Sequence, residues 1–354
     1  MRCLLAILLI LSGLGPAMAS PGDWLDEFIE CNEECTAIRQ CFGPNESGFL
    51  TSHKSSNFKR TPFLLRHFLL WDCASDCDYQ CQQIVTKERI ASGKKIEQFH
   101  GKWPFKRVLG TQEFFSTVFS VGNFIPHYRG LKLLAAERKR TPAWNKARVL
   151  LTSYMSVAVV GMLAWTASTV FHTRDVDITE KCDYFFAGAT VLSGFHAISI
   201  RVFRLDCLDG VRRIFSYSVG ALFALHILRL LLDWSYTYNM RFNIFFGVLQ
   251  YLLLIALAYR NYTKLKTLSY SRKPRYASKS SLLNRLCLVP VGLVIGTSLA
   301  MSFELFDIFN YDLQIDSHSI WHACTVLPSW KLYDFFVDDI VHLKACESDN
   351  MNAE

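Results

Sequence analysis

Three histidines, a serine and an aspartate lie at the ends of apolar segments, where together they could hold a metal ion and do hydrolytic chemistry. His318 and His322 are four residues apart, a spacing that places both rings on one face of a helix. Ser168 and His172 have the same spacing, and Asp183 follows them after a short loop. Three histidines that leave a fourth position open for water form the typical catalytic zinc site, in which the ion lowers the pKa of the water to about 7.

The other two side chains suit the same reaction. The Asp183 carboxylate could transfer a proton, and the Ser168 hydroxyl could hydrogen-bond the water or a developing oxyanion. The alternative is chance, because a chain with 10 histidines contains some pairs at this spacing near membrane interfaces. We favour the metal site because all five residues are expected at one membrane depth. His196 and His226 have no spaced partner and are expected to be packing histidines.

The apolar segments identify a membrane protein. Of 354 residues, 51% are hydrophobic and 19% are charged, and the net charge of +7 is spread over loops, which excludes a simple nucleic-acid binder. Seven segments are about long enough to cross a bilayer as helices. They are residues 108–125, 149–171, 184–200, 214–232, 242–259, 286–303 and 321–337. The first and last contain charged residues, which predicts positions inside a bundle.

The positive charges in the loops predict the orientation. With the N-terminus in the lumen, the cytoplasmic loops hold 19 Lys and Arg and the lumenal loops hold 3. Cytoplasmic loops carry such an excess, so we expect seven spans, a lumenal N-terminus and a cytoplasmic tail at residues 341–354. The sequon at Asn261 then lies in the cytoplasm and is expected to stay unmodified.

The segment before the spans has the features of a secreted domain. Residues 1–19 are typical of a signal peptide, residues 20–104 are expected to form a lumenal domain, and residues 105–340 the seven-span domain. Asn45 begins a glycosylation sequon. Six cysteines predict disulfides, with 15 possible pairings, and a metal cluster is the less favoured alternative: Cys31, Cys35, Cys41, Cys73, Cys77 and Cys81. The domain could recognise a glycan or an attached protein, or serve as a disulfide-stapled cap for folding.

The five polar residues resemble a known group of membrane enzymes. The pattern Ser168-x3-His172, Asp183 and His318-x3-His322 is similar to that of the CREST superfamily of seven-span hydrolases, which includes alkaline ceramidases and adiponectin-receptor-like proteins. The cysteine spacing and several lumenal segments look like the post-GPI-attachment phospholipase family, over nearly the whole chain after the signal peptide. These segments are LWDC at 70–73, QFHGKWPF at 98–105 and Gln112-Glu113.

The resemblance implies a specific activity. Members of that family remove the sn-2 acyl chain from the phosphatidylinositol of protein-bound GPI anchors, in the Golgi apparatus or the endoplasmic reticulum. By similarity, His172, His318 and His322 would hold Zn²⁺, Asp183 would act as acid and base, and Ser168 would support the water or the oxyanion. GPI-anchored proteins and membrane lipid would be the partners.

Two other classes remain open. A ceramidase-like amidase could use the same residues, although the long cysteine-rich domain favours the GPI family. A non-enzymatic seven-span receptor or chaperone could bind structural zinc through the same histidines. Phosphate-binding loops and the serine-hydrolase elbow are missing from the sequence, which excludes simple nucleotide-dependent and serine-hydrolase chemistry.

Overall fold

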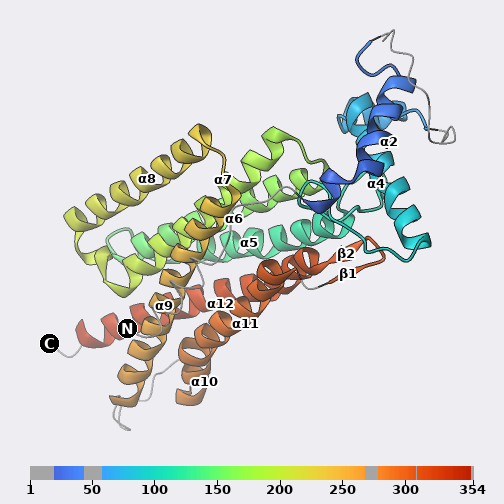
Figure 1. Cartoon of the computed structure of the whole chain (residues 1–354). Helices are drawn as coiled ribbons and strands as arrows, with labels where there is room; N and C mark the ends of the chain where they lie inside the picture. Colours follow the sequence, from blue (N-terminus) through green and yellow to red (C-terminus); the bar gives the residue numbers. More distant parts are fainter. Residues whose placement is uncertain (1–19, 44–57, 268–277, 308, 352–354) are drawn as a thin grey trace.

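The computed structural model describes residues 20–43, 58–267, 278–307 and 309–351, which are almost entirely helical. The predicted signal peptide and the sequon at Asn45 lie outside the described residues. A small domain containing α2 and α4 stands at one end of a bundle of long helices, and the end of α12 lies at the opposite end (Figure 1). The predicted all-α class is confirmed, apart from one short hairpin of β1 and β2.

The described elements belong to a small domain and a helical bundle. The small domain contains η1 (Pro21–Trp24), α2 (Asp26–Ile38), α3 (Phe63–Phe68) and α4 (Cys73–Ala91). The bundle contains α5 (Phe114–Arg140), α6 (Ala147–Thr173), α7 (Asp177–Val202), η2 (Leu205–Cys207), α8 (Asp209–Leu232), α9 (Tyr236–Thr267), α10 (Lys279–Leu283), η3 (Asn284–Leu288), α11 (Val289–Phe306) and α12 (Ser317–Met351). The antiparallel strands β1 (Asn310–Tyr311) and β2 (Ile315–Asp316) lead into α12.

Three disulfides hold the small domain together, as the sequence predicts. The cysteines on α2 and α4 recur every four residues and therefore share one face of each helix. A cysteine that comes later in α2 is bonded to a cysteine that comes earlier in α4, so these two helices are antiparallel. The bridges are Cys31–Cys81, Cys35–Cys77 and Cys41–Cys73. Because every one of the six sulfurs is bonded to another, the alternative of a metal cluster is wrong.

One buried carboxylate organises the polar side of this domain. Asp76 is 1% exposed, and its Oδ2 accepts hydrogen bonds from Arg39, Thr61 and Gln80. Its Oδ1 accepts a bond of 2.7 Å from Nη2 of Arg107. Burial alone raises the pKa of Asp76, but the hydrogen bonds from the two arginines outweigh it and hold the pKa below its usual value.

The lowered pKa of Asp76 predicts acid sensitivity of the small domain. A carboxyl group with a lower pKa in the folded state contributes stability above its unfolded pKa of about 3.9, and that stability is lost as the pH falls through the folded value. The Asp76→Asn change leaves two arginines without their carboxylate and should destabilise the domain by about 3 kcal/mol. Hydrogen exchange of α4 in the full chain should be faster in Asp76→Asn at pH 6. Wild type should lose protection only below about pH 4. Unchanged exchange in Asp76→Asn, with the exposed Glu88→Gln as control, would contradict this.

Two glycines allow the helices that carry the polar residues to approach closely. A Cβ at Gly161 of α6 would lie 2.2 Å from Nδ1 of His127 on α5, and a Cβ at Gly130 of α5 would lie 2.2 Å from the ring of Tyr333 on α12. His127 and Tyr333 also share a hydrogen bond of 2.6 Å. Larger residues at either glycine would push α6 or α12 away from α5.

Five helical segments in the described chain are long and apolar enough to span a membrane. They are Ala147–Thr173, Asp177–Val202, Asp209–Leu232, Tyr236–Lys266 and Lys279–Phe306. They match five of the seven predicted segments. The first and last predictions fall in α5 and α12, which pack together but carry charged residues, including the 2.8 Å ion pair of Arg129 with Asp334. These two helices are not confirmed as spans.

Several predicted boundaries differ from the structure. Residues 108–113 precede α5, because Val108 pairs with Thr111 in a turn. The expected tail boundary at residue 341 falls inside α12, which continues to Met351. At this end of the bundle, Arg201 of α7 and Asp339 of α12 form a buried ion pair, with bonds of 2.6 and 2.8 Å.

Candidate metal centre

The three predicted histidines come together where α6 ends and α12 begins. His172 lies in the last turn of α6, and backbone bonds from Gln112 and Glu113 to the carbonyls of residues 173 and 172 fix the start of α5 beside it. In α12, the first turn is capped reciprocally, because Ser319 N donates to Asp316 Oδ1 and Asp316 N donates to Ser319 Oγ. This cap fixes the residue at which α12 begins, and therefore the side of the helix on which its two histidines lie, which faces α6.

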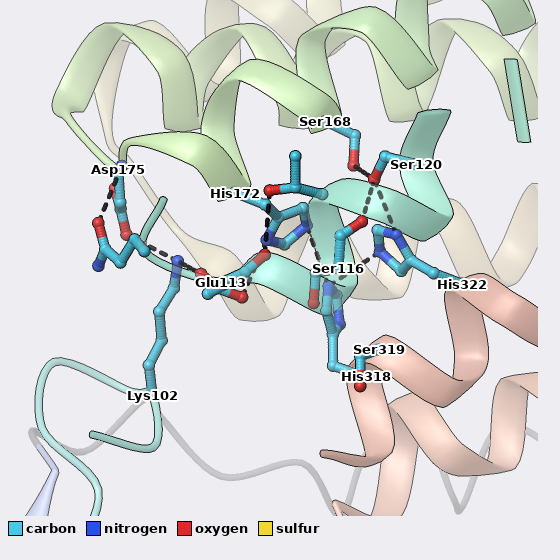
Figure 2. Close-up of polar contacts among 12 residues, drawn as sticks. Lys102, Glu113, Ser116, Ser120, Ser168, His172, Asp175, His318, Ser319 and His322 are labelled. Carbon is cyan, nitrogen blue, oxygen red and sulfur yellow. Dashed lines mark hydrogen bonds and ion pairs between the residues drawn. The ribbon is translucent and has the colours of Figure 1, made fainter. Parts of the chain in front are cut away.

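The three Nε2 atoms face a common point (Figure 2). The Nε2 atom of His318 lies 3.3 Å from that of His172 and 3.0 Å from that of His322. His172 and His322 are each 2% exposed, whereas the side chain of His318 is 30% exposed. Two of the three candidate ligands are therefore buried, and the third is partly exposed.

This geometry fits a zinc ion. At Zn–N distances of 2.0–2.1 Å, two histidine nitrogens of a tetrahedral site lie about 3.3 Å apart. The two measured distances are close to that value, and three neutral imidazoles are a common donor set for zinc. His172, His318 and His322 can thus hold the ion that the sequence predicts.

The opposite nitrogen of each ring has its own hydrogen-bond partner. Nδ1 of His172 lies 2.9 Å from Glu113 Oε2, and Nδ1 of His318 bonds Glu304 Oε2. Nδ1 of His322 lies 3.0 Å from Ser120 Oγ. When Nδ1 carries the proton in such a bond, Nε2 presents its lone pair to a metal. The three partners therefore favour the tautomer that a metal requires.

The remaining two predicted residues occupy different positions. Ser168 Oγ lies 3.0 Å from Ser120 Oγ, so its hydrogen bond leads through Ser120 to His322. Asp183, in α7, interacts electrostatically with His172 and His318 but makes no hydrogen bond with the three rings in the described part of the chain. The structure brings all five residues to one region. Ser168 lies on the Nδ1 side of His322, where Ser120 connects the two, and not among the three Nε2 atoms.

Comparison with known proteins gives the family. Residues 62–340 match the Per1-like family. The chain belongs to this family. It is 53% identical over 335 residues to Protein PER1 of Saccharomyces cerevisiae, covering 91% of this chain and 93% of that protein. It is 31% identical over 345 residues to the human protein named GPI-specific phospholipase A2-like PGAP3, covering 97% of each chain. No solved structure matches this chain.

These matches confirm the resemblance to GPI-remodelling proteins that the sequence indicates. The hamster and mouse proteins with the same name as the human one are also 31% identical to this Per1-like chain, over 95% of its length. The range matched by the family, residues 62–340, contains all five predicted site positions.

A lysine of the small domain completes the surroundings of His172. Lys102 contacts Glu113, which bonds His172, and its Nζ lies 2.8 Å from Oδ2 of Asp175 (Figure 2). Burial alone lowers the pKa of Lys102, but the two carboxylates outweigh it and raise the pKa above its usual value. The small domain is therefore tied to the centre by a charged contact.

Sequence reasoning did not assign Ser120, Glu304 or Lys102 to the site. Glu304 had a usable signal, because it is the single charged residue of an otherwise apolar segment, residues 289–306, and an ionisable group there points to function. Ser120 had no comparable signal, because its partners Ser168 and His322 lie 48 and 202 residues away in sequence. Lys102 had none because it lies in a polar segment outside the predicted spans, where a charged residue is common. Only the folded chain shows these contacts.

Removing the partner of His318 should weaken metal binding. The Glu304→Ala change leaves Nδ1 of His318 without its acceptor, and loss of such a partner typically costs 10–100-fold in metal affinity. Glu304→Gln should lose less, because the amide oxygen still accepts the bond. Competition with a chromophoric zinc chelator measures the affinity. An unchanged affinity in Glu304→Ala, compared with the exposed control Asp312→Asn, would show that Glu304 does not position the ligand.

Proposed function

We propose that this chain is a zinc-dependent, GPI-specific phospholipase A2-type hydrolase, which removes the sn-2 acyl chain from the phosphatidylinositol of GPI-anchored proteins. The observation that carries the proposal is the convergence of three histidine Nε2 atoms whose Nδ1 atoms are all hydrogen-bonded. Membership of the Per1-like family, and the name of the PGAP3 relatives, support the substrate class.

The ligands of the proposed ion are His172, His318 and His322. When bound there, zinc supplies Lewis acidity toward the ester carbonyl and lowers the pKa of a water molecule. Glu113 accepts the hydrogen bond from Nδ1 of His172 and thereby holds the ring with its Nε2 atom directed at the proposed ion.

Asp183 is the proposed acid and base. It accepts the proton of the attacking water as the bond from water oxygen to acyl carbon forms, and it returns the proton to the alkoxide when the ester C–O bond breaks. The products are a free fatty acid and the lyso form of the anchor. In the observed arrangement, Ser168 acts on the site through Ser120 and His322. Direct stabilisation of an oxyanion by Ser168 stays a prediction.

We further propose seven spans, a lumenal N-terminus and a cytoplasmic C-terminus, in the Golgi membrane or that of the endoplasmic reticulum. The distribution of Lys and Arg supports the orientation. The disulfide-linked domain and the three histidines lie at the same end of the bundle, which fits an oxidising lumen. Asn261, of the sequon expected in the cytoplasm, is 3% exposed, which agrees with the expectation that it stays unmodified.

A GPI-anchored reporter tests the proposal in cells that lack this protein. Mass spectrometry of the purified reporter should show an anchor without its unsaturated sn-2 chain, or with a replaced one, only after rescue with wild type. Rescue with His322→Ala should leave the original chain in place. An anchor lipid that is the same with wild type, with His322→Ala and without rescue would overturn the proposal. A change in ceramide instead would favour the ceramidase-like amidase.

A further inference from the structure

A cavity of about 290 Å³ lies between the small domain and the start of the bundle. Its walls come from α4, from residues 99–105 and from the ends of the segments that surround His172. Cavities of roughly this size and upward are the usual sites for small ligands or for parts of larger ones. The proposed reaction does not use any group in the cavity.

Residues that line the cavity are connected to the candidate metal centre by hydrogen bonds and ion pairs. Gln112 and Asp175 line the cavity, and the backbone N–H of Asp175 donates a bond of 3.1 Å to Gln112 Oε1. Lys102, also in the lining, joins Asp175 to Glu113 and through it to His172. Figure 2 shows Asp175, Lys102 and His172 in this order. A molecule in the cavity would therefore lie directly beside the proposed site of hydrolysis, on its lumenal side.

The walls combine aromatic rings with planar polar groups. Five of the lining residues are Trp, Tyr or Phe, and Trp103 among them is partly exposed. On the α4 wall, Asp78 accepts bonds from Gln82 Nε2 at 2.8 Å and from His100 at 2.9 Å. Each hydroxyl of a sugar or inositol ring is both a donor and an acceptor, and its C–H face is apolar. This lining therefore matches a polyhydroxylated ring.

Arg174 is the one cation of the lining that forms no close ion pair in the described part of the chain, although Asp175 and Asp72 attract it at longer range. Lys102 is neutralised by two carboxylates, and His100 lies against Asp78 and Asp23. Arg174 instead stacks on the ring of Trp71 at 4.0 Å and donates to backbone carbonyls. Its buried Nε has no hydrogen-bond partner in the described part of the chain. A single available guanidinium fits one phosphodiester.

We propose that this cavity binds the polar head group of the lipid substrate, an inositol ring joined to a phosphodiester, and thereby positions the ester at the metal centre. The inference rests on the proposed function. In this arrangement, α4 and residues 99–105 contact the ring, and Arg174 contacts the phosphate. The small domain is then a substrate-recognition module and not only a disulfide-stapled cap.

Binding of soluble head groups tests the proposal without relying on catalysis. The full chain in detergent should bind glycerophosphoinositol more tightly than glycerophosphocholine, myo-inositol or inorganic phosphate, as measured by calorimetry. Ser75→Phe adds a ring to the α4 wall and should weaken glycerophosphoinositol binding at least tenfold. Glu88→Ala, on an exposed part of α4, should bind as wild type does.

Further variants separate the outcomes. Arg174→Gln should reduce the affinity for glycerophosphoinositol to that for myo-inositol, because only the phosphate contact is lost. His322→Ala should lose zinc and still bind glycerophosphoinositol. If it did not, the head group would bind at the metal centre and the cavity proposal would be wrong. Wild-type affinity in both Ser75→Phe and Arg174→Gln, or equal binding of inorganic phosphate and glycerophosphoinositol, would also overturn it. Retained binding by a chain without lipase activity would refute the proposed function alone.

Discussion

The His172→Ala variant is expected to lose hydrolysis by at least about 10³-fold and to lose tightly bound zinc with it. Removal of one of three histidine ligands leaves two, both on α12, and a catalytic zinc site typically needs three protein ligands. The Nδ1–H of His172 also donates to Glu113, so its removal leaves that buried carboxylate with Lys102 as its remaining partner among the described residues. Metal analysis and release of labelled fatty acid by the purified variant measure both effects.

The matched control for this change is His196→Ala. His196 is also a histidine inside the bundle, and it hydrogen-bonds Ser216 at 2.8 Å, away from the three convergent rings. This variant should retain zinc and activity. If His172→Ala kept wild-type zinc content and lipase activity, the metal-ligand role would be refuted.

The Asp183→Asn variant is expected to lower kcat by about 10²–10⁴-fold while it keeps its zinc, because general acid–base groups contribute that much. Asparagine has nearly the same shape but cannot accept and return a proton. KM should change little, because the proposed role of Asp183 is confined to proton transfer in the chemical step. Steady-state kinetics and metal analysis of the same preparation give both values.

Asp177→Asn provides the control for Asp183→Asn. Asp177 begins α7 and pairs with Lys181 at 2.7 Å on the exposed surface, so its loss should leave kcat unchanged. A kcat of Asp183→Asn equal to wild type would exclude Asp183 as the proton carrier. Loss of zinc in Asp183→Asn would instead assign it to metal binding.

Local spacing predicted much of this fold and site. The four-residue spacing of His318 and His322 places them on one face of a helix, and α12 has them there. The same spacing among five of the six cysteines, all but Cys41, reflects the facing sides of α2 and α4. The lengths of the apolar segments in the sequence predicted the five helices that could span a membrane.

Contacts between distant segments were not predictable in the same way. The disulfide pairing depends on the antiparallel arrangement of α2 and α4, which spacing alone does not determine. The partners Ser120 and Glu304 are 202 and 14 residues from the histidines that they contact, on other helices. In the first and last predicted segments, charged groups such as Glu113 lower the apolarity, while the helices α5 and α12 still pack in the bundle. Apolar length alone therefore does not determine whether these two helices span the membrane.

The most direct test of the central claim uses the purified chain in lipid nanodiscs, with a GPI lipid labelled in its sn-2 acyl chain. The proposed function predicts release of the labelled fatty acid, loss of this release after zinc is removed by a chelator, and recovery when zinc is restored. Release that is unaffected by the chelator would contradict the metal mechanism. No release from the GPI lipid by zinc-loaded protein would contradict the proposed activity itself.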